Sequence, residues 1–201
     1  MKNLTRTVAL SHCPDYQRKN VEESIRNILD QMGGSGQFIS PGDRVLIKPN
    51  LLKGSLPEEC ITTHPAIVEA VVRIVLDHGG RPFIGDSPAF GDLTAVAKAT
   101  GMADICKRYN IPLQPFNSPV AVKVSDPFVR TLHIDKAVLD ADKIINIPKL
   151  KTHVQVGFSG GVKNLFGCLS GKKKVLWHFK AGDKEHRFGR MLLEIYNTLS
   201  P

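Results

Sequence analysis

Three segments decide the fold of this chain: RVLIK at residues 44–48, AIVEAVVRIVLD at 66–77 and PFIGD at 82–86. The first and third are short, apolar runs that predict buried strands, and the second repeats apolar residues at helical intervals. A hydroxyl cap followed by Pro65 marks the beginning of this helix, and Gly79-Gly80 marks its end. A strand, a helix and a strand with short connections are typical of a parallel βαβ unit.

The sequence on both sides extends this unit. Before it we expect a short strand over residues 7–10 and a helix over 21–32. After it the patterns predict, in order, helical material over 93–109 broken near Gly101, a strand from residue 111, an antiparallel strand pair at 120–124 and 131–134, a core strand at 142–147 and a last helix at 188–199. The predicted fold is therefore α/β, with a mostly parallel sheet flanked by helices and a small antiparallel hairpin excursion.

Length and composition indicate one domain in an aqueous compartment. With 201 residues and 42% apolar side chains the chain can bury one core, so we expect a single domain over residues 1–201. No run reaches the roughly 18–20 apolar residues of a membrane span. The amino terminus also lacks the apolar region of a secretory signal. We therefore expect a soluble, cytoplasmic protein with no membrane partner.

The four cysteines are spread along the chain and include no Cys-x-x-Cys pair. This spacing favours free thiols in a reducing compartment. It speaks against a zinc or iron–sulfur site contained within these residues. Cys168 lies in the most unusual segment, and its role stays open.

The net charge of +8 is unevenly distributed, because residues 143–180 contain many lysines and no Asp or Glu. Such a stretch attracts phosphate, carboxylate or nucleic acid, and a solvated basic loop is the alternative. Residues 172–180 mix lysines with aromatic residues that could stack on bases. No nucleic-acid fold signature accompanies them, so we do not expect nucleic acid to be the partner.

Polar side chains follow the carboxyl ends of three expected strands. Ligands of open α/β sheets bind at that edge, because loops and helix amino termini converge there. A single polar residue after a strand is common and indicates little. The functional signal is that polar residues follow three strands that end at the same edge, namely Lys48, Asn50, Asp86, Ser87, Lys149, Lys151 and His153.

The segment GFSGGVKNLFG at 157–167 resembles a phosphate cradle in outline. Its glycines permit close backbone approach, and Lys163 suits an oxyanion. The spacings of a Walker loop and of a dinucleotide fingerprint are both absent. A tight turn packed under a helix is the alternative.

His64 and His153 are candidates for proton transfer or metal ligation, although a solitary histidine is more often structural. Lys149 and Lys151 precede His153. Two nearby ammonium groups are expected to lower the pKa of His153 and keep its imidazole neutral, which is the form that acts as a base.

Five ordered motifs together resemble the domain of unknown function family 362: KPNLL at 48–52, TTHP at 62–65, GDSP at 85–88, NIPKLKTH at 146–153 and GVKNLFG at 161–167. The resemblance covers residues 45–171 and implies an α/β domain. Longer bacterial and archaeal members often carry a ferredoxin-like module with two four-iron clusters, but the family implies no settled activity.

This chain departs from those longer members because it has no Cys-x-x-Cys-x-x-Cys run. Iron–sulfur binding is therefore not carried over to any residue, and the cofactor stays unknown. Family domains usually continue past the equivalent of Pro201, so the resemblance implies that residues 1–201 are the N-terminal part of a longer domain.

The leading hypothesis is a domain that binds an anionic small molecule at the carboxyl edge of the sheet, as an enzyme of redox or iron–sulfur-linked metabolism. The candidate proton-handling and catalytic groups are Asp86, His153 and Lys149, and no metal ligand is assigned. The candidate ligand-binding residues are Lys48, Asn50, His64, Ser87, Lys151, Thr152, Lys163 and Asn164. The alternative is a non-catalytic binding or scaffold module for a ferredoxin-like, iron–sulfur or acidic protein, and whether the chain is an enzyme stays open.

Overall fold

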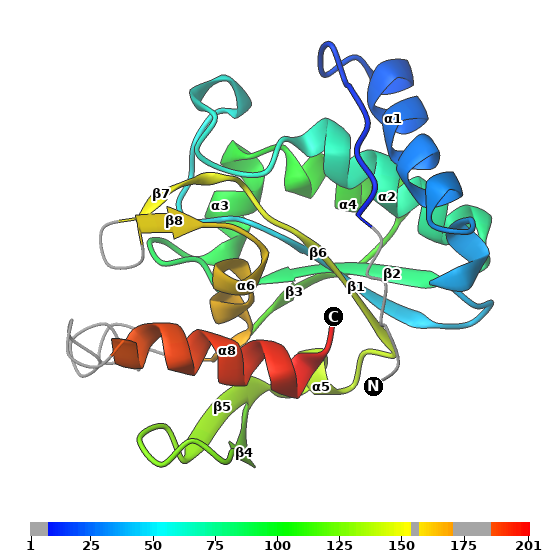
Figure 1. The fold of residues 1–201 in the computed structure, drawn as a ribbon. Helices are drawn as coiled ribbons and strands as arrows, with labels where there is room; N and C mark the ends of the chain where they lie inside the picture. Colours follow the sequence, from blue (N-terminus) through cyan, green and yellow to red (C-terminus); the bar gives the residue numbers. More distant parts are fainter. Residues whose placement is uncertain (1–7, 154–156, 171–185) are drawn as a thin grey trace.

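A four-stranded parallel sheet in the order β3-β2-β1-β6 forms the centre of the fold (Figure 1). The computed structural model describes residues 8–153, 157–170 and 186–201. The sheet strands are β1 (Arg44–Pro49), β2 (Arg81–Asp86), β3 (Leu113–Pro115) and β6 (Lys143–Ile147). Every pairing within this sheet is parallel, so the predicted α/β class is confirmed.

Helices cover both faces of the sheet (Figure 1). One face carries α1 (Arg18–Gln31), α2 (Pro65–Asp77), α3 (Leu93–Ala99) and α4 (Met102–Tyr109). The other face carries α5 (Lys136–Leu139), α6 (Gly161–Asn164) and α8 (Arg187–Leu199). Single 3₁₀ turns lie at Ser35–Gln37 (η1), Pro57–Glu59 (η2) and Leu165–Cys168 (η3).

Alternate side chains of β1 pack into two separate hydrophobic cores. Val45 and Ile47 pack under α2, α3 and α4, whereas Leu46 packs on the opposite side with residues of α8 and η3. This alternation is the period of two that a strand imposes, and β1 is buried on both faces because helices cover both. The predicted helix over 93–109 does break at Gly101, which has a φ of 77°.

Two antiparallel hairpins leave the sheet. The first pairs β4 (Pro119–Lys123) with β5 (Thr131–Asp135), which confirms the predicted excursion. The second pairs β7 (Lys151–His153) with β8 (Gly157–Ser159). The sequence did not predict this second hairpin, because three-residue strands are too short to show a periodicity.

Two local predictions are wrong. The described part of the expected strand at 7–10 forms no strand, and Val8 and Leu10 are 81% and 83% exposed. A run of apolar residues becomes a strand only where a neighbouring strand is available. The hydroxyl cap of α2 is also wrong, because His64 Nδ1 accepts the hydrogen bond from the backbone N–H of Ala66 at 3.2 Å.

None of the helices in the described ranges has the length and apolar character that a membrane crossing requires. The aromatic and lysine-rich stretch at 172–180 lies outside the described residues, as does residue 7 of the expected first strand.

Candidate functional site

The carboxyl ends of β1 and β6 lie side by side where the strand order reverses. The chain runs from β1 to β2 and β3 on one side, and then returns to place β6 on the other side of β1. Pro49 at the end of β1 is opposite Ile147 at the end of β6. In open α/β sheets such a switch point opens a crevice for ligands.

A buried ion pair lies at the carboxyl ends of β1 and β2. Lys48 Nζ is 2.9 Å from Asp86 Oδ1, and the two side chains are 1% and 5% exposed. The backbone N–H groups of Leu51 and Ser87 donate to the Asp86 carboxylate at 2.9 and 2.7 Å, and Lys48 Nζ donates to Pro49 O at 2.7 Å. The carboxylate is therefore held by several donors and ties the loops after β1 and β2 together.

Gly167 of η3 packs directly against this ion pair. A Cβ at this position would lie 2.8 Å from Lys48 Nζ and closer still to Asp86 Oδ1. A side chain larger than hydrogen would displace one of the two charges. The glycine is thus required by close packing rather than by an unusual backbone angle.

Asn164 is the centre of a buried amide network. Its Nδ2 donates to Lys48 O at 3.1 Å and to Asn146 Oδ1 at 2.8 Å, and its Oδ1 accepts from Asn50 Nδ2 at 3.0 Å. Asn146 Nδ2 in turn donates to Gly161 O at 2.8 Å. This network joins the ends of β1 and β6 to α6, so it fixes the relative positions of the loops at this edge of the sheet.

Sequence reasoning missed Asn146 and Thr63. Asn146 is a polar residue inside the apolar run of β6, which is a signal that could have been used. Thr63 Oγ1 accepts from the N–H of Asn50 and donates to Ile147 O, both at 2.8 Å. Both residues lie within the motifs quoted above, and both hold the loops at this edge of the sheet in place.

Lys151 reaches into the network from β7. Its Nζ donates to Asn50 Oδ1 at 2.7 Å and to Ile61 O at 3.2 Å. Burial lowers the pKa of Lys151, and the neighbouring Lys149 lowers it further, while Asp86 opposes both effects. The half-buried Lys149 therefore adds to the positive potential at this point.

Lys163 of α6 is a cation that burial perturbs strongly. Its Nζ lies 5.0 Å from the ring centroid of Phe166 and 5.7 Å from that of Phe188. Burial lowers the pKa of Lys163 to about 8, and the positive charges of Lys151 and Lys48 contribute to this shift against the pull of Asp86. Aromatic faces and like charges thus surround an ammonium group that has lost much of its water.

His153 lies next to these cations. Its ring is nearly parallel to that of Phe188, with 6.1 Å between the centroids. Burial is the largest cause of its lowered pKa, followed by the charges of Lys163 and Lys151. The lowered pKa agrees with the prediction of a neutral imidazole. Its causes differ in part from those predicted, because burial and the charge of Lys163 lower the pKa in place of the expected charge of Lys149.

The other candidate residues are half-buried or exposed. His64 caps α2 and stacks on Tyr16 with 3.7 Å between ring centroids. Burial lowers the pKa of His64, Glu58 opposes this, and Lys149 adds to it. Thr152 is exposed on β7, and the backbone rather than the hydroxyl of Ser87 contacts Asp86.

The glycine-rich segment does not form a loop in front of a long helix. It is divided among β8, the four-residue α6 and η3, and Gly157 is its one glycine with positive φ, at 68°. Phe166 contacts Phe188 of α8 edge-on at 5.6 Å. The segment positions Lys163, Asn164 and Gly167 by packing under α8.

Across the described ranges, no group of three His, Cys, Asp or Glu side chains is placed to hold a metal ion. The site instead combines ammonium groups, amides and one imidazole. Such a set of donors can bind and orient an anion, and the neutral imidazole can accept a proton.

These features define a doubly wound α/β domain with a cluster of cationic and amide side chains at its switch point. The sequence model described as "Domain of unknown function (DUF362)" matches residues 45–201, so the chain belongs to this family. The chain is also 44% identical over 199 residues to the "Thylakoid-associated protein sll1697" of Synechocystis sp. (strain ATCC 27184 / PCC 6803 / Kazusa). The match covers 98% of this chain and 61% of that relative, so this chain spans under two thirds of the relative's length. No solved structure matches the chain.

Proposed function

We propose that the chain binds an anionic small molecule at the switch point after β1 and β6, through Lys151 and Lys163. The observation that carries this proposal is an excess of positive charge. Within the described part of the chain, Asp86 is the carboxylate that acts on both lysines, and it is already paired with Lys48. A bound anion would compensate the two remaining ammonium groups.

The surrounding groups suit the orientation of such a ligand. The amides of Asn50 and Asn164 are fixed by hydrogen bonds to each other and to the backbone of β1. The neutral imidazole of His153 supplies a proton acceptor beside the two lysines. This arrangement favours an enzyme, and a place in redox or iron–sulfur-linked metabolism is proposed from family association.

Isothermal titration with inorganic phosphate and with malonate at low ionic strength tests the proposal. A charge-assisted hydrogen bond contributes about 1.5–3 kcal/mol, so Lys163→Gln is expected to weaken binding by about tenfold or more. Lys107→Gln, on the exposed end of α4, is the matched control and is expected to leave the affinity unchanged. Equal affinities in the two variants, or no binding of either anion to the unmodified chain, contradict the proposal.

Exposed apolar side chains beside the switch point favour a second candidate, a docking module for an acidic protein partner. Leu150 and Phe158 are 68% and 58% exposed, and both lie close to Gly160. Lys149 and Lys151 are their neighbours in the chain. If Phe158→Ser leaves malonate and phosphate binding unchanged, the small-molecule site does not depend on this apolar surface.

We also propose the cytoplasm as the location of this chain. The relative is named for association with the thylakoid. Cell fractionation separates the two possibilities, since recovery of the chain with the membranes at physiological salt contradicts a cytoplasmic location.

A further inference from the structure

No strand of the described residues pairs with the outer edge of β6. In the described part of the chain β6 is the last strand of its sheet and pairs only with β1. Four of its five residues are half-buried and one is exposed, whereas β1 is buried along almost its whole length. Ile145 and Ile147 pack on the helical core on one face and Ile144 on the core of the other. The strand therefore has the composition of an interior strand and the exposure of an edge.

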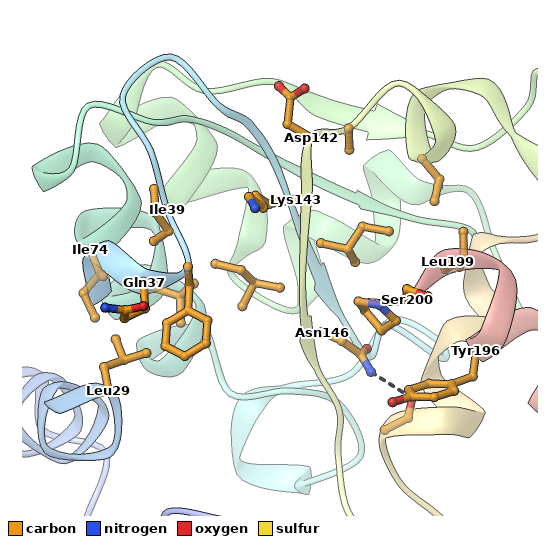
Figure 2. A pocket seen from close by; sticks show the side chains of 18 of the residues that line it. Leu29, Gln37, Ile39, Ile74, Asp142, Lys143, Asn146, Tyr196, Leu199 and Ser200 are labelled. Carbon is orange, nitrogen blue, oxygen red and sulfur yellow. Dashed lines mark hydrogen bonds between the residues drawn. The ribbon is translucent and has the colours of Figure 1, made fainter. Parts of the chain in front are cut away.

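A large cleft of about 880 Å³ runs along this edge. Figure 2 shows Leu29, Ile39 and Ile74 on one side of the strand and Tyr196 and Leu199 on the other. The cleft is thus walled by α1 and α2 above the sheet and by the end of α8 below it. Its floor is β6 itself.

Several large apolar side chains of this cleft are incompletely covered. Met32, Phe38, Leu139 and Tyr196 all line it, and they are 38%, 37%, 39% and 42% exposed. Exposed apolar side chains beside an unpaired strand are typical of a surface that binds another segment.

The order of the sheet indicates which segment fits. Counted along the chain, its four strands occur in the order 3-2-1-4, which is the first part of the doubly wound order 3-2-1-4-5-6. In that order the next strand lies parallel to the fourth, on its open side. The β6 edge is this position.

The longer relative supplies a source for such a strand. Only 61% of its length matches this chain, so about two fifths of it lies outside the match. We infer that the β6 edge and its cleft bind a strand parallel to β6, contributed by the region that the thylakoid-associated relative has outside the match.

Two other occupants fit the geometry less well. A small apolar molecule would leave the outward N–H and C=O groups of β6 without partners. A second copy of the chain would present a β6 that is itself recessed between α1 and α8. Two recessed edges cannot both reach the other, so a single projecting strand is the better match.

Hydrogen–deuterium exchange tests the inference. The chain alone is compared with a single polypeptide that also carries the unmatched region of the relative, attached at the end where it occurs there. Those amides of residues 143–147 that point away from β1 are expected to exchange at least tenfold more slowly in the longer polypeptide. Residues 44–49 of the interior strand β1 provide the internal control and should exchange slowly in both.

A charged substitution in the cleft separates docking from general stabilisation. Tyr196→Glu changes a side chain that is 42% exposed, so it should leave the melting temperature of the chain alone unchanged. In the longer polypeptide the same change should remove the added protection of 143–147. Phe90→Glu is the matched control, because Phe90 is 68% exposed and does not line the cleft. This variant should retain the added protection of residues 143–147.

Either of two results overturns the inference. One is unchanged exchange of 143–147 in the longer polypeptide. The other is slow exchange of 143–147 in the chain alone together with a dimer mass by light scattering, because a second copy would then occupy the edge.

Discussion

Replacing Gly167 by alanine should break the buried ion pair at the carboxyl ends of β1 and β2. The new methyl group would lie 2.8 Å from Lys48 Nζ and 2.9 Å from Lys48 Cε, and closer still to Asp86 Oδ1. Neither partner has room to retreat, because the Lys48 and Asp86 side chains are 1% and 5% exposed. The carboxylate is also held by the N–H groups of Leu51 and Ser87.

The expected loss in free energy of unfolding is about 3 kcal/mol. Overpacking of a core by one methyl costs roughly 1–3 kcal/mol, and each charge-assisted hydrogen bond that is lost adds about 1.5–3 kcal/mol. Complete removal of one partner of a buried pair costs about 3–5 kcal/mol, which sets the upper limit. For a domain of this size, 3 kcal/mol lowers the melting temperature by about 6–12 °C.

Urea unfolding followed by circular dichroism measures this difference. Gly189→Ala is the matched control, because a Cβ at Gly189 meets nothing within 4 Å and the residue lies inside α8. Alanine is favoured over glycine in a helix, so the control should gain about 0.5–1 kcal/mol. If Gly167→Ala unfolds within about 0.5 kcal/mol of the unmodified chain, the proposed close packing on the ion pair is refuted.

Three further changes test the site and its supports. Asn164→Leu should lower the free energy of unfolding by about 2–3 kcal/mol in urea, since it leaves several buried polar groups without partners, and a near-neutral result would contradict the network. The pKa of Lys163 is about 8 in the folded chain and 10.5 ordinarily, so between these pH values the unfolded chain binds more protons than the folded chain. The free energy of unfolding should therefore rise with pH across that window. Lys163→Met should flatten this rise, and an identical pH profile in the variant would count against the lowered pKa. His64→Ala should lower the free energy of unfolding by about 0.5–2 kcal/mol, because the hydrogen bond that caps the N–H of Ala66 is lost. A similar loss in Tyr16→Ala alone would assign the effect to the ring stacking instead.

Local patterns were sufficient for most of the sheet and its helices. The β1, α2 and β2 segments each carry a strong periodicity and a clear stop signal, so their order predicted a parallel unit that the structure confirms. The β7–β8 hairpin was not predicted because its three-residue strands show no periodicity, and the His64 cap was not predicted because the adjacent threonines offered the more usual hydroxyl cap. Residues 8–10 differ, because whether an apolar run becomes a strand depends on a neighbouring strand in space.

The candidate site divides in a similar way. Topology placed Lys48, Asp86 and Lys151 at one edge of the sheet, and the structure brings them together there. The sequence did not show which lysine forms an ion pair with a carboxylate. Lys48 ends the apolar run of β1 and Lys163 lies within a glycine-rich segment, yet neither pattern shows that the first has a carboxylate at 2.9 Å and the second lies over aromatic rings.

The sequence by itself determined the class of fold, the order of its elements and the edge at which polar side chains gather, because these follow from periodicity and from stop signals within a few residues. Only the tertiary structure decided the buried ion pair under Gly167, the amide network around Asn164 and the edge position of β6. The ion pair and the amide network join residues that are far apart in the chain, and the edge position of β6 depends on which distant strand pairs with it, so all three depend on the packing of the whole sheet.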